Sequence, residues 1–297
     1  MTIHMSEHVA ETTRQASEQP RYAVPTVRSR RRYGEMIGWI IVGLAILGLV
    51  SNMLTNPRWN WETIGEYLFD PIVLQGVGST IMLTISSGGA GLVFGLIIAL
   101  MKLSKSQVLQ HVATAYIGFI RAIPALVLIL MLYFTSALFP TINIGVPFLV
   151  SFFEIPTNSV ITQFGAAWLG LTMIMAAHCG EIIRGGISAV PPGQLEASKA
   201  LSLGQATAYR KIILPQATRV SIPSFANELV TLFKNTSLVS VIGYTELLTV
   251  VQSIYGRTYE TIPLVLVVCL WYLTMTTLAM IGQSRLEKKY GRGFERS

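Results

Sequence analysis

The sequence predicts an all-α, polytopic helix bundle that spans a membrane. Of its 297 residues, 52% are hydrophobic and only 12% are charged, and the mean hydropathy is +0.55. A soluble domain usually carries about 25% charged residues, so this chain has too little polar surface for a protein surrounded by water. Its apolar content also excludes an intrinsically disordered chain. An integral membrane protein is therefore the expected class.

Six apolar segments are candidates for membrane-spanning helices, because about 20 apolar helical residues cross a hydrocarbon core of about 30 Å. Four runs meet this length, at residues 36–55, 77–101, 160–180 and 262–283. A fifth run, at 122–139, is shorter and almost purely apolar. The sixth, at 224–246, contains several polar side chains, so hydropathy alone leaves it undecided.

The distribution of basic residues favours six crossings over five. Residues 1–35 and the segment after 283 are both rich in Arg or Lys, and the positive-inside rule places such ends in the cytoplasm. Two cytoplasmic ends need an even number of spans. With six spans, all but three of the 22 Lys and Arg residues fall in cytoplasmic segments or at their borders, the exceptions being Arg58, Lys234 and Arg257. The net charge of +7 is thus a topology signal rather than a nucleic-acid surface.

The two ends of the chain are polar. Residues 1–35 predict a flexible cytoplasmic tail, and residues 291–297 a cytoplasmic C-terminal tail. The basic residues before 36 resemble the start of a secretory signal peptide, but the charged region is long and no small-x-small cleavage site follows. We therefore expect residues 36–73 to form an uncleaved first membrane helix and an outer loop.

Small residues recur within two of the predicted spans. Gly91 and Gly95 lie one turn apart on one face of the second span, and the fourth span is similarly rich in Gly and Ala. Small residues at this spacing let helices approach closely in lipid. They predict helix packing and carry no information about a substrate.

Polar and ionisable side chains at membrane depth are costly unless they face water or a partner. Those predicted to line a translocation pathway are Arg121, His178, Glu181, Glu228, Lys234, Asn235 and Thr236. Glu181 and Arg184, three residues apart, equally fit a structural ion pair. Lys234 lies deepest and is expected to face the bundle interior, a water-filled path or an acidic partner such as Glu181 or Glu228. A buried structural ion pair is the alternative for Lys234.

No motif for chemistry appears in the chain. It has no G-x-x-x-x-G-K-[ST] phosphate loop, no His-Glu-x-x-His and no G-x-S-x-G elbow. Its two cysteines, Cys179 and Cys269, lie in apolar runs and form no disulfide or metal framework. We expect a transport subunit with no catalytic residue, no metal and no cofactor of its own, and with no nucleic-acid partner.

The polar segment 190–216 predicts a helix–turn–helix. Pro191 and Pro192 are suited to open a helix, and Gly204 is suited to end it. A second short helix follows, in which Pro215 is expected to be the last residue; its apolar positions are Tyr209, Ile212, Ile213 and Leu214. Exposed apolar residues on such an element favour a docking surface for another protein. The alternative is a solvated connector whose apolar residues rest on the bundle.

This segment resembles the EAA loop of ABC importer permeases, whose pattern is Glu-Ala-Ala-x3-Gly-x9-Ile-x-Leu-Pro. The residues at the corresponding positions are Glu196, Ala197, Ser198, Ser202, Ile212, Leu214 and Pro215. Ser198 replaces the second Ala and Ser202 replaces the Gly. Gly204, two residues further on, is expected to provide the turn instead.

Other segments resemble the permeases for polar amino acids of the histidine/glutamine/arginine type. They are Gly78–Ile85, Phe119–Val127, Gly180–Ile187 and Asn227–Gly243. The family usually has Arg-Gly-Thr-Pro where this chain has Arg121-Ala-Ile-Pro124. The resemblance covers about 74–290 and leaves the tail and the first span outside.

The resemblance implies a five-helix importer core preceded by one extra helix. It implies two permease subunits, identical or paralogous, two ATP-binding cassette subunits that hold ATP and Mg²⁺, and an extracytoplasmic solute-binding protein. Residues 196–215 would seat in the ATPase subunit as coupling helices.

The function expected from this resemblance is translocation of a polar amino acid across the bacterial inner membrane, with both termini cytoplasmic. One alternative is another small solute, such as an opine, methionine or an oxyanion. The other is an ion-coupled secondary transporter in which Glu181, Glu228 and Lys234 form an ion relay.

Overall fold

The computed structural model describes residues 33–146 and 150–290, most of which are helical. The chain divides into two units, Met1–Asn56 and Pro57–Ser297. The predicted C-terminal tail and all but the last three residues of the predicted N-terminal tail lie outside the described residues. Residues 33–35 already belong to the first helix, which therefore begins three residues earlier than predicted.

The first unit contains α2, Tyr33–Thr55, which has no buried residue. Its 23 residues are long enough to cross a hydrocarbon core of about 30 Å. A helix that is apolar all round suits contact with lipid. The predicted first membrane helix is thus present.

The second unit opens with η1 (Pro57–Trp59) and α3 (Trp61–Leu68), which lead into α4 (Pro71–Lys102). Asp70 begins α4 by accepting a hydrogen bond from the backbone N–H of Ile72 at 2.8 Å, and Pro71 occupies the first turn, where no N–H is needed. This 32-residue helix contains the predicted span 77–101.

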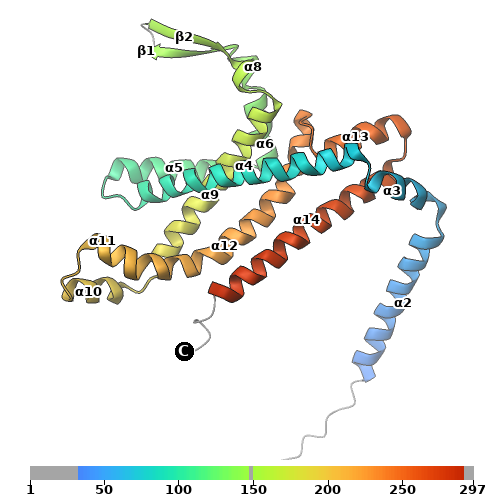
Figure 1. The fold of residues 1–297 in the computed structure, drawn as a ribbon, viewed down its shortest axis with the longest axis horizontal. Helices are drawn as coiled ribbons and strands as arrows, with labels where there is room; N and C mark the ends of the chain where they lie inside the picture. Colours follow the sequence, from blue (N-terminus) through green and yellow to red (C-terminus); the bar gives the residue numbers. More distant parts are fainter. Residues whose placement is uncertain (1–32, 147–149, 291–297) are drawn as a thin grey trace, which may run out of the picture. The chain divides into compact units, whose positions relative to one another are not determined.

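Helix α4 crosses α9, Gln163–Ser188, in close contact (Figure 1). A Cβ added at Gly91 would lie 2.5 Å from the Met175 Cβ, and one at Gly95 would lie 2.5 Å from the Cys179 Cβ. Real Cβ atoms cannot approach that closely, so only glycine permits this crossing. The close packing predicted from the small residues is confirmed.

The predicted span 122–139 is not one helix. It is divided among the end of α5 (Gln107–Ala122), α6 (Ala125–Tyr133) and α7 (Thr135–Leu138). The chain bends by 102° between α5 and α6. Pro124 disfavours helical backbone at the residue before it, and Ile123 is extended, with φ −91° and ψ 132°.

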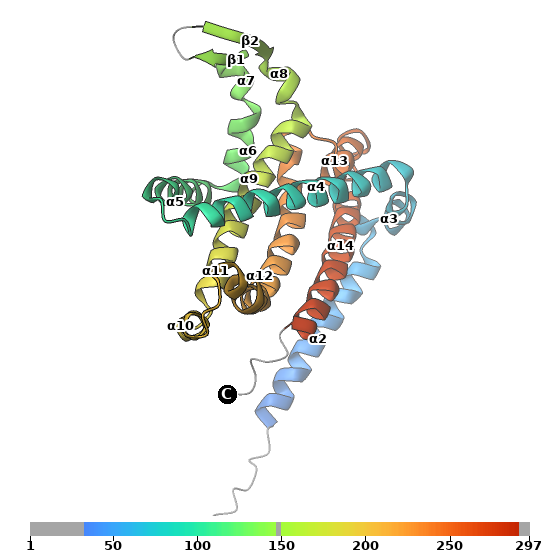
Figure 2. The same ribbon diagram turned by 60° about the vertical axis from the view of Figure 1, so that its left-hand side comes forward.

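An antiparallel hairpin follows, formed by β1 (Thr141–Val146) and β2 (Val150–Pro156). Thr141 pairs with Pro156 at its base, and α8 (Thr157–Val160) connects it to α9. The sequence predicted no strand here. Figures 1 and 2 show the hairpin projecting from one end of the second unit.

The chain after α9 forms α10 (Pro192–Ala200), α11 (Gln205–Ala208), a π-helical turn η2 (Tyr209–Ile213), α12 (Leu214–Asn235) and a 3₁₀ segment η3 (Thr236–Ile242). From Gln205 to Ile242 these pieces form one continuous helical segment. The helix that contains the start of the predicted span 224–246 therefore begins earlier, since α12 starts at Leu214, ten residues before 224.

Pro215 was predicted to end the second short helix. It lies instead in the first turn of α12. Proline lacks the N–H that would bond to the carbonyl four residues earlier. The π turn directly before it widens the helix at that point, and such bulges accommodate missing bonds without ending a helix.

Helices α13 (Leu247–Thr258) and α14 (Thr261–Tyr290) complete the unit. One buried apolar cluster joins α3, α4, α13 and α14, and a second joins α4, α6, α9, α12 and η3. By length and composition, α2, α4, α9 and α14 can each cross a membrane, and the two bent segments raise the number to six if each is one span.

Within the second unit, α10 and α11 lie at the end away from the hairpin in both views (Figures 1 and 2). The helices α9 and α12 run toward this end and carry the helix–turn–helix between them. The polar loop and the hairpin therefore mark opposite ends of this unit.

Candidate functional site

The segment between α9 and α12 packs on the helix ends that flank it. Val190, Ile213 and Ala217 form a small buried cluster, and Ile187, Tyr209 and Ile212 pack against it. This cluster joins the two ends of segment 190–216, at Val190 and Ile213, to α9 and α12, so the helix–turn–helix is attached to both helices through a small core of its own.

Three leucine side chains of this element are accessible. Leu201, Leu203 and Leu214 are 71%, 37% and 44% exposed. Exposed apolar side chains on such an element favour contact with another protein. Of the predicted coupling residues, one is buried (Ser198), one is half-buried (Ile212), and the others are exposed: Glu196, Ala197, Ser202, Gly204, Leu214 and Pro215.

Ser202, not Gly204, makes the turn after α10. Ser202 has φ +56°, whereas Gly204 has φ −59° and precedes α11. The N–H of Ser202 donates to the carbonyl of Lys199 at 2.9 Å, and that of Leu203 to Ser198 at 3.0 Å. These two bonds define a Schellman motif, which needs a left-handed residue at this place. The prediction that Gly204 supplies the turn was wrong.

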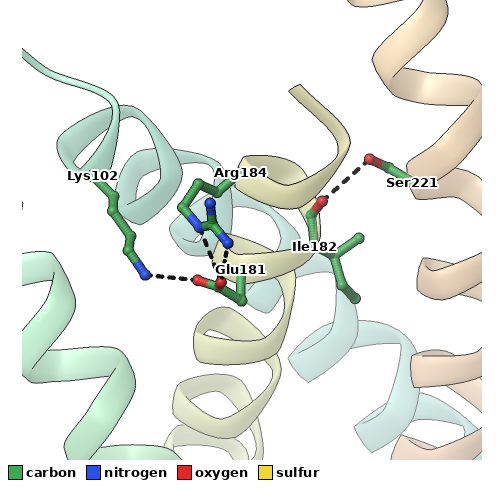
Figure 3. Close-up of polar contacts among 5 residues, drawn as sticks. All are labelled: Lys102, Glu181, Ile182, Arg184 and Ser221. Carbon is green, nitrogen blue, oxygen red and sulfur yellow. Dashed lines mark hydrogen bonds and ion pairs between the residues drawn. The ribbon is translucent and has the colours of Figure 1, made fainter. Parts of the chain in front are cut away.

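A cluster of three charges lies where α9 approaches the end of α4 (Figure 3). Lys102 Nζ lies 2.8 Å from Glu181 Oε2, and Arg184 Nε lies 2.9 Å from Glu181 Oε1. The three side chains are 22–33% exposed. The predicted Glu181–Arg184 pair is confirmed. Lys102 was missed as its third member because 79 residues of sequence separate it from Glu181.

A cavity of about 390 Å³ opens beside this cluster. It is lined by Arg121, His178, Glu181, Ile182, Pro223, Ser224, Asn227, Glu228, Gln283 and Glu287. His178 Nδ1 and Glu228 Oε2 lie 3.4 Å apart and connect α9 with α12. Four of the predicted pathway residues, Arg121, His178, Glu181 and Glu228, are therefore brought to one cavity.

Both signs of charge line this cavity. Its carboxylates suit an ammonium or guanidinium group, and its guanidinium suits a carboxylate. Among residues 33–146 and 150–290, no group of three His, Cys, Asp or Glu side chains is arranged to hold a metal ion.

The family described as binding-protein-dependent transport system inner membrane component matches residues 91–292. This chain belongs to that family. The resemblance to ABC importer permeases, first carried by the EAA-like segment, is thereby confirmed.

Curated relatives of this permease narrow the class. It is 37% identical to the arginine transport system permease protein ArgU of Corynebacterium glutamicum, over 90% of this chain and 83% of that protein. It is 36% identical to the probable amino-acid ABC transporter permease protein YckA of Bacillus subtilis, over 80% of this chain and 98% of that protein.

A solved amino acid ABC transporter with histidines shares the fold, with a TM-score of 0.63 and 32% sequence identity over 74% of this chain and 95% of that chain. The MetNI methionine ABC transporter, at 23% identity and a TM-score of 0.53, shares the fold as well. Together with the curated relatives, these likenesses show a multi-pass membrane permease of an amino acid ABC importer. The ion-coupled secondary transporter considered from sequence is thus excluded.

Lys234 of the permease is exposed on the surface of this chain. It pairs with neither acidic partner named for it, because Glu181 pairs with Lys102 and Arg184, and Glu228 with His178. Neither Lys234 nor its neighbours Asn235 and Thr236 line the cavity.

Thr236 of the permease is buried, and its hydroxyl donates to the carbonyl of Phe233 at 2.6 Å. It also lies 3.3 Å from the hydroxyl of Tyr272. These contacts give Thr236 a packing role on this chain.

Glu246 of the permease was missed by sequence reasoning, although its side chain is fully buried. It accepts hydrogen bonds from the backbone N–H groups of Leu248 and Thr249, each at 2.9 Å, and from the Tyr272 hydroxyl at 3.0 Å. It thereby caps α13 and joins it to α14. An acidic residue directly before an apolar run was the available signal.

Proposed function

We propose that this permease is driven by a separate ATP-binding cassette subunit that grips residues 190–216. The observation that carries the proposal is the exposed leucine surface on a helix–turn–helix anchored to α9 and α12. In a loop that only connected two helices, a leucine that is 71% exposed, as Leu201 is, would not add to stability. Burial of one leucine side chain in a partner contributes about 1.5–3 kcal/mol.

The remaining partners follow from the same proposal. The cassette subunit holds the ATP and Mg²⁺, an extracytoplasmic solute-binding protein delivers the cargo, and a second permease, identical or paralogous, completes the membrane part. The family's own description, which names dependence on a binding protein, supports the second of these. The basic residues at both chain ends support cytoplasmic termini in an inner membrane.

In the proposed mechanism, closure of the cassette dimer pulls on α10 and α11. Because Val190, Ile213 and Ala217 join the ends of this segment to α9 and α12, the pull tilts both spans between inward-facing and outward-facing states. Cargo shifts the balance between these states only through contacts that differ between them.

The proposed cargo is a polar amino acid of the arginine kind. The relatives at 30–37% identity include two arginine permeases and permeases for nopaline and octopine. The cavity contains Glu228 and Glu287, carboxylates that fit a guanidinium or ammonium group, while Arg121 fits the α-carboxylate.

The pathway is proposed to include the cavity residues Arg121, His178, Glu181 and Glu228. Lys234 and the half-buried Asn235 are proposed to contribute from the surface that the second permease covers, whereas the buried Thr236 supports them from within this chain. The exposure of Lys234 on this single chain supports that assignment, because a lysine facing lipid at membrane depth is costly.

The test is replacement of Leu201 by Asp in the complete importer. We expect the amount of cassette subunit that co-purifies to fall about tenfold, which corresponds to about 1.4 kcal/mol, and ATP-driven uptake to fall with it. Gln205→Asp adds the same charge at another exposed position of the loop and removes no apolar surface, so it serves as the matched control. Unchanged co-purification and uptake in Leu201→Asp would contradict the docking proposal.

A further inference from the structure

The inner part of α9 is fixed tightly to α12. The Ser221 hydroxyl donates to the Ile182 carbonyl at 3.3 Å (Figure 3). A Cβ added at Gly186 would lie 2.0 Å from the Ser221 Oγ and 2.9 Å from the Ala217 carbonyl oxygen. The two backbones therefore touch with no deformable side-chain layer between them, and α9 and α12 must move together here.

An ion pair joins the end of α4 to this same part of α9. Lys102 is the last residue of α4, and its ammonium lies 2.8 Å from Glu181. Glu181 lies about two helical turns before α9 ends at Ser188, and three non-helical residues then lead to α10 at Pro192. A shift of α10 therefore reaches Glu181 through this short connection and the last two turns of α9.

Lys102 is not needed to neutralise the charge of Glu181. Arg184, on the same helix as Glu181, already contacts its carboxylate through two guanidinium nitrogens. That pair lies within one helix and cannot bind α9 to anything else. The second cation adds a link between helices to a carboxylate that already has a partner.

We propose that Lys102, Glu181 and Arg184 are positioning residues that transmit movement of the helix–turn–helix from α9 to α4. Arg184 orients the Glu181 carboxylate, and Lys102 ties the end of α4 to it. The α9–α12 pair and α4 then respond to the cassette subunit as one body. This inference rests on the proposed function, because it needs a separate motor that moves α10 and α11.

The test is Lys102→Met in the complete importer, reconstituted in liposomes with its cassette subunit and binding protein. ATP hydrolysis and uptake of radiolabelled arginine are measured together. We expect the cargo moved per ATP hydrolysed to fall at least about fivefold, the lower end of typical coupling between two sites. Lys102→Arg keeps the charge and reach and should retain most of the ratio. Lys105→Met removes an exposed lysine three residues away and should leave the ratio unchanged.

A role in folding alone would give a different result. It would lower the yield of assembled importer in Lys102→Met and reduce hydrolysis and uptake in equal proportion, with the ratio unchanged, and that outcome overturns the inference. Lys102→Gln, which keeps a polar side chain at a position that does not line the cavity, is expected to lower the ratio in the same way and provides the answer if Lys102→Met does not assemble. If the wild-type importer itself shows no ATP-driven uptake of any amino acid, the proposed function fails instead.

Discussion

At the scale of single residues, Ser202 determines the shape of the docking loop. Its left-handed backbone, with φ +56°, closes the Schellman motif after α10. A side chain in this region costs about 1–2 kcal/mol because Cβ crowds the following carbonyl. Serine therefore carries strain at the position where the EAA pattern has glycine.

Ser202→Gly is expected to stabilise the permease by up to about 1 kcal/mol, since relief of this strain exceeds the added entropy of the unfolded chain. The measurement is thermal unfolding of the purified protein in detergent. Gly204→Ala is the control, because φ −59° suits alanine and no atom lies within 4 Å of the added Cβ. If Gly204→Ala destabilised the permease and Ser202→Gly did not stabilise it, the assignment of the turn to Ser202 would be contradicted.

At the scale of elements, two prolines have opposite effects. Pro124 separates α5 from α6 with a bend of 102°, whereas Pro215 lies within a helical segment that continues from Gln205 to Ile242. The π turn before Pro215 accommodates the backbone hydrogen bond that proline cannot donate. Before Pro124, by contrast, Ile123 is extended and the helix ends. Proline alone does not decide between these outcomes, because each depends on how the flanking helices pack.

The crossing of α4 and α9 depends on Gly95. We expect Gly95→Ala to destabilise the permease by about 1–3 kcal/mol, the usual cost of adding a methyl group to a well-packed core, because the added Cβ would lie 2.5 Å from the Cys179 Cβ. Thermal unfolding in detergent measures the change. Gly89→Ala, on a face with nothing within 4 Å, should cause no loss. Equal stability of the two variants would show that the close approach of α4 and α9 at Gly95 does not limit the stability of the permease.

At the scale of the whole second unit, the hairpin and the docking loop lie at opposite ends (Figure 2). The proposed topology places the loop in the cytoplasm and the hairpin outside. Each end has an exposed polar residue suited to chemical labelling, Glu154 in β2 and Gln205 at the start of α11.

In intact cells, we expect a membrane-impermeant maleimide to label Glu154→Cys but not Gln205→Cys. Both substitutions are made together with Cys269→Ser, because Cys269 is exposed and Cys179 is buried. After the cells are opened, Gln205→Cys should become reactive, which controls for its accessibility. Labelling of Gln205→Cys in intact cells would place the loop outside and end the coupling proposal.

The sequence alone predicted the membrane class, the four straight spans and the helix–turn–helix. Apolar length determines whether a helix can cross lipid, and prolines with adjacent apolar positions mark a short amphipathic element, so local information suffices for these features. It also placed Glu181 beside Arg184, because residues three apart on a helix are neighbours by geometry.

Only the tertiary structure placed Lys102 on Glu181, gathered Arg121, His178 and Glu228 at one cavity, and put Lys234 on the surface. These contacts join helices that are far apart in sequence. Their geometry follows from which backbones can touch, at Gly95 and Gly186 above all. Charge and hydropathy fix the depth of a side chain in the membrane, but the direction in which it points is set by the packing of its helix against the others.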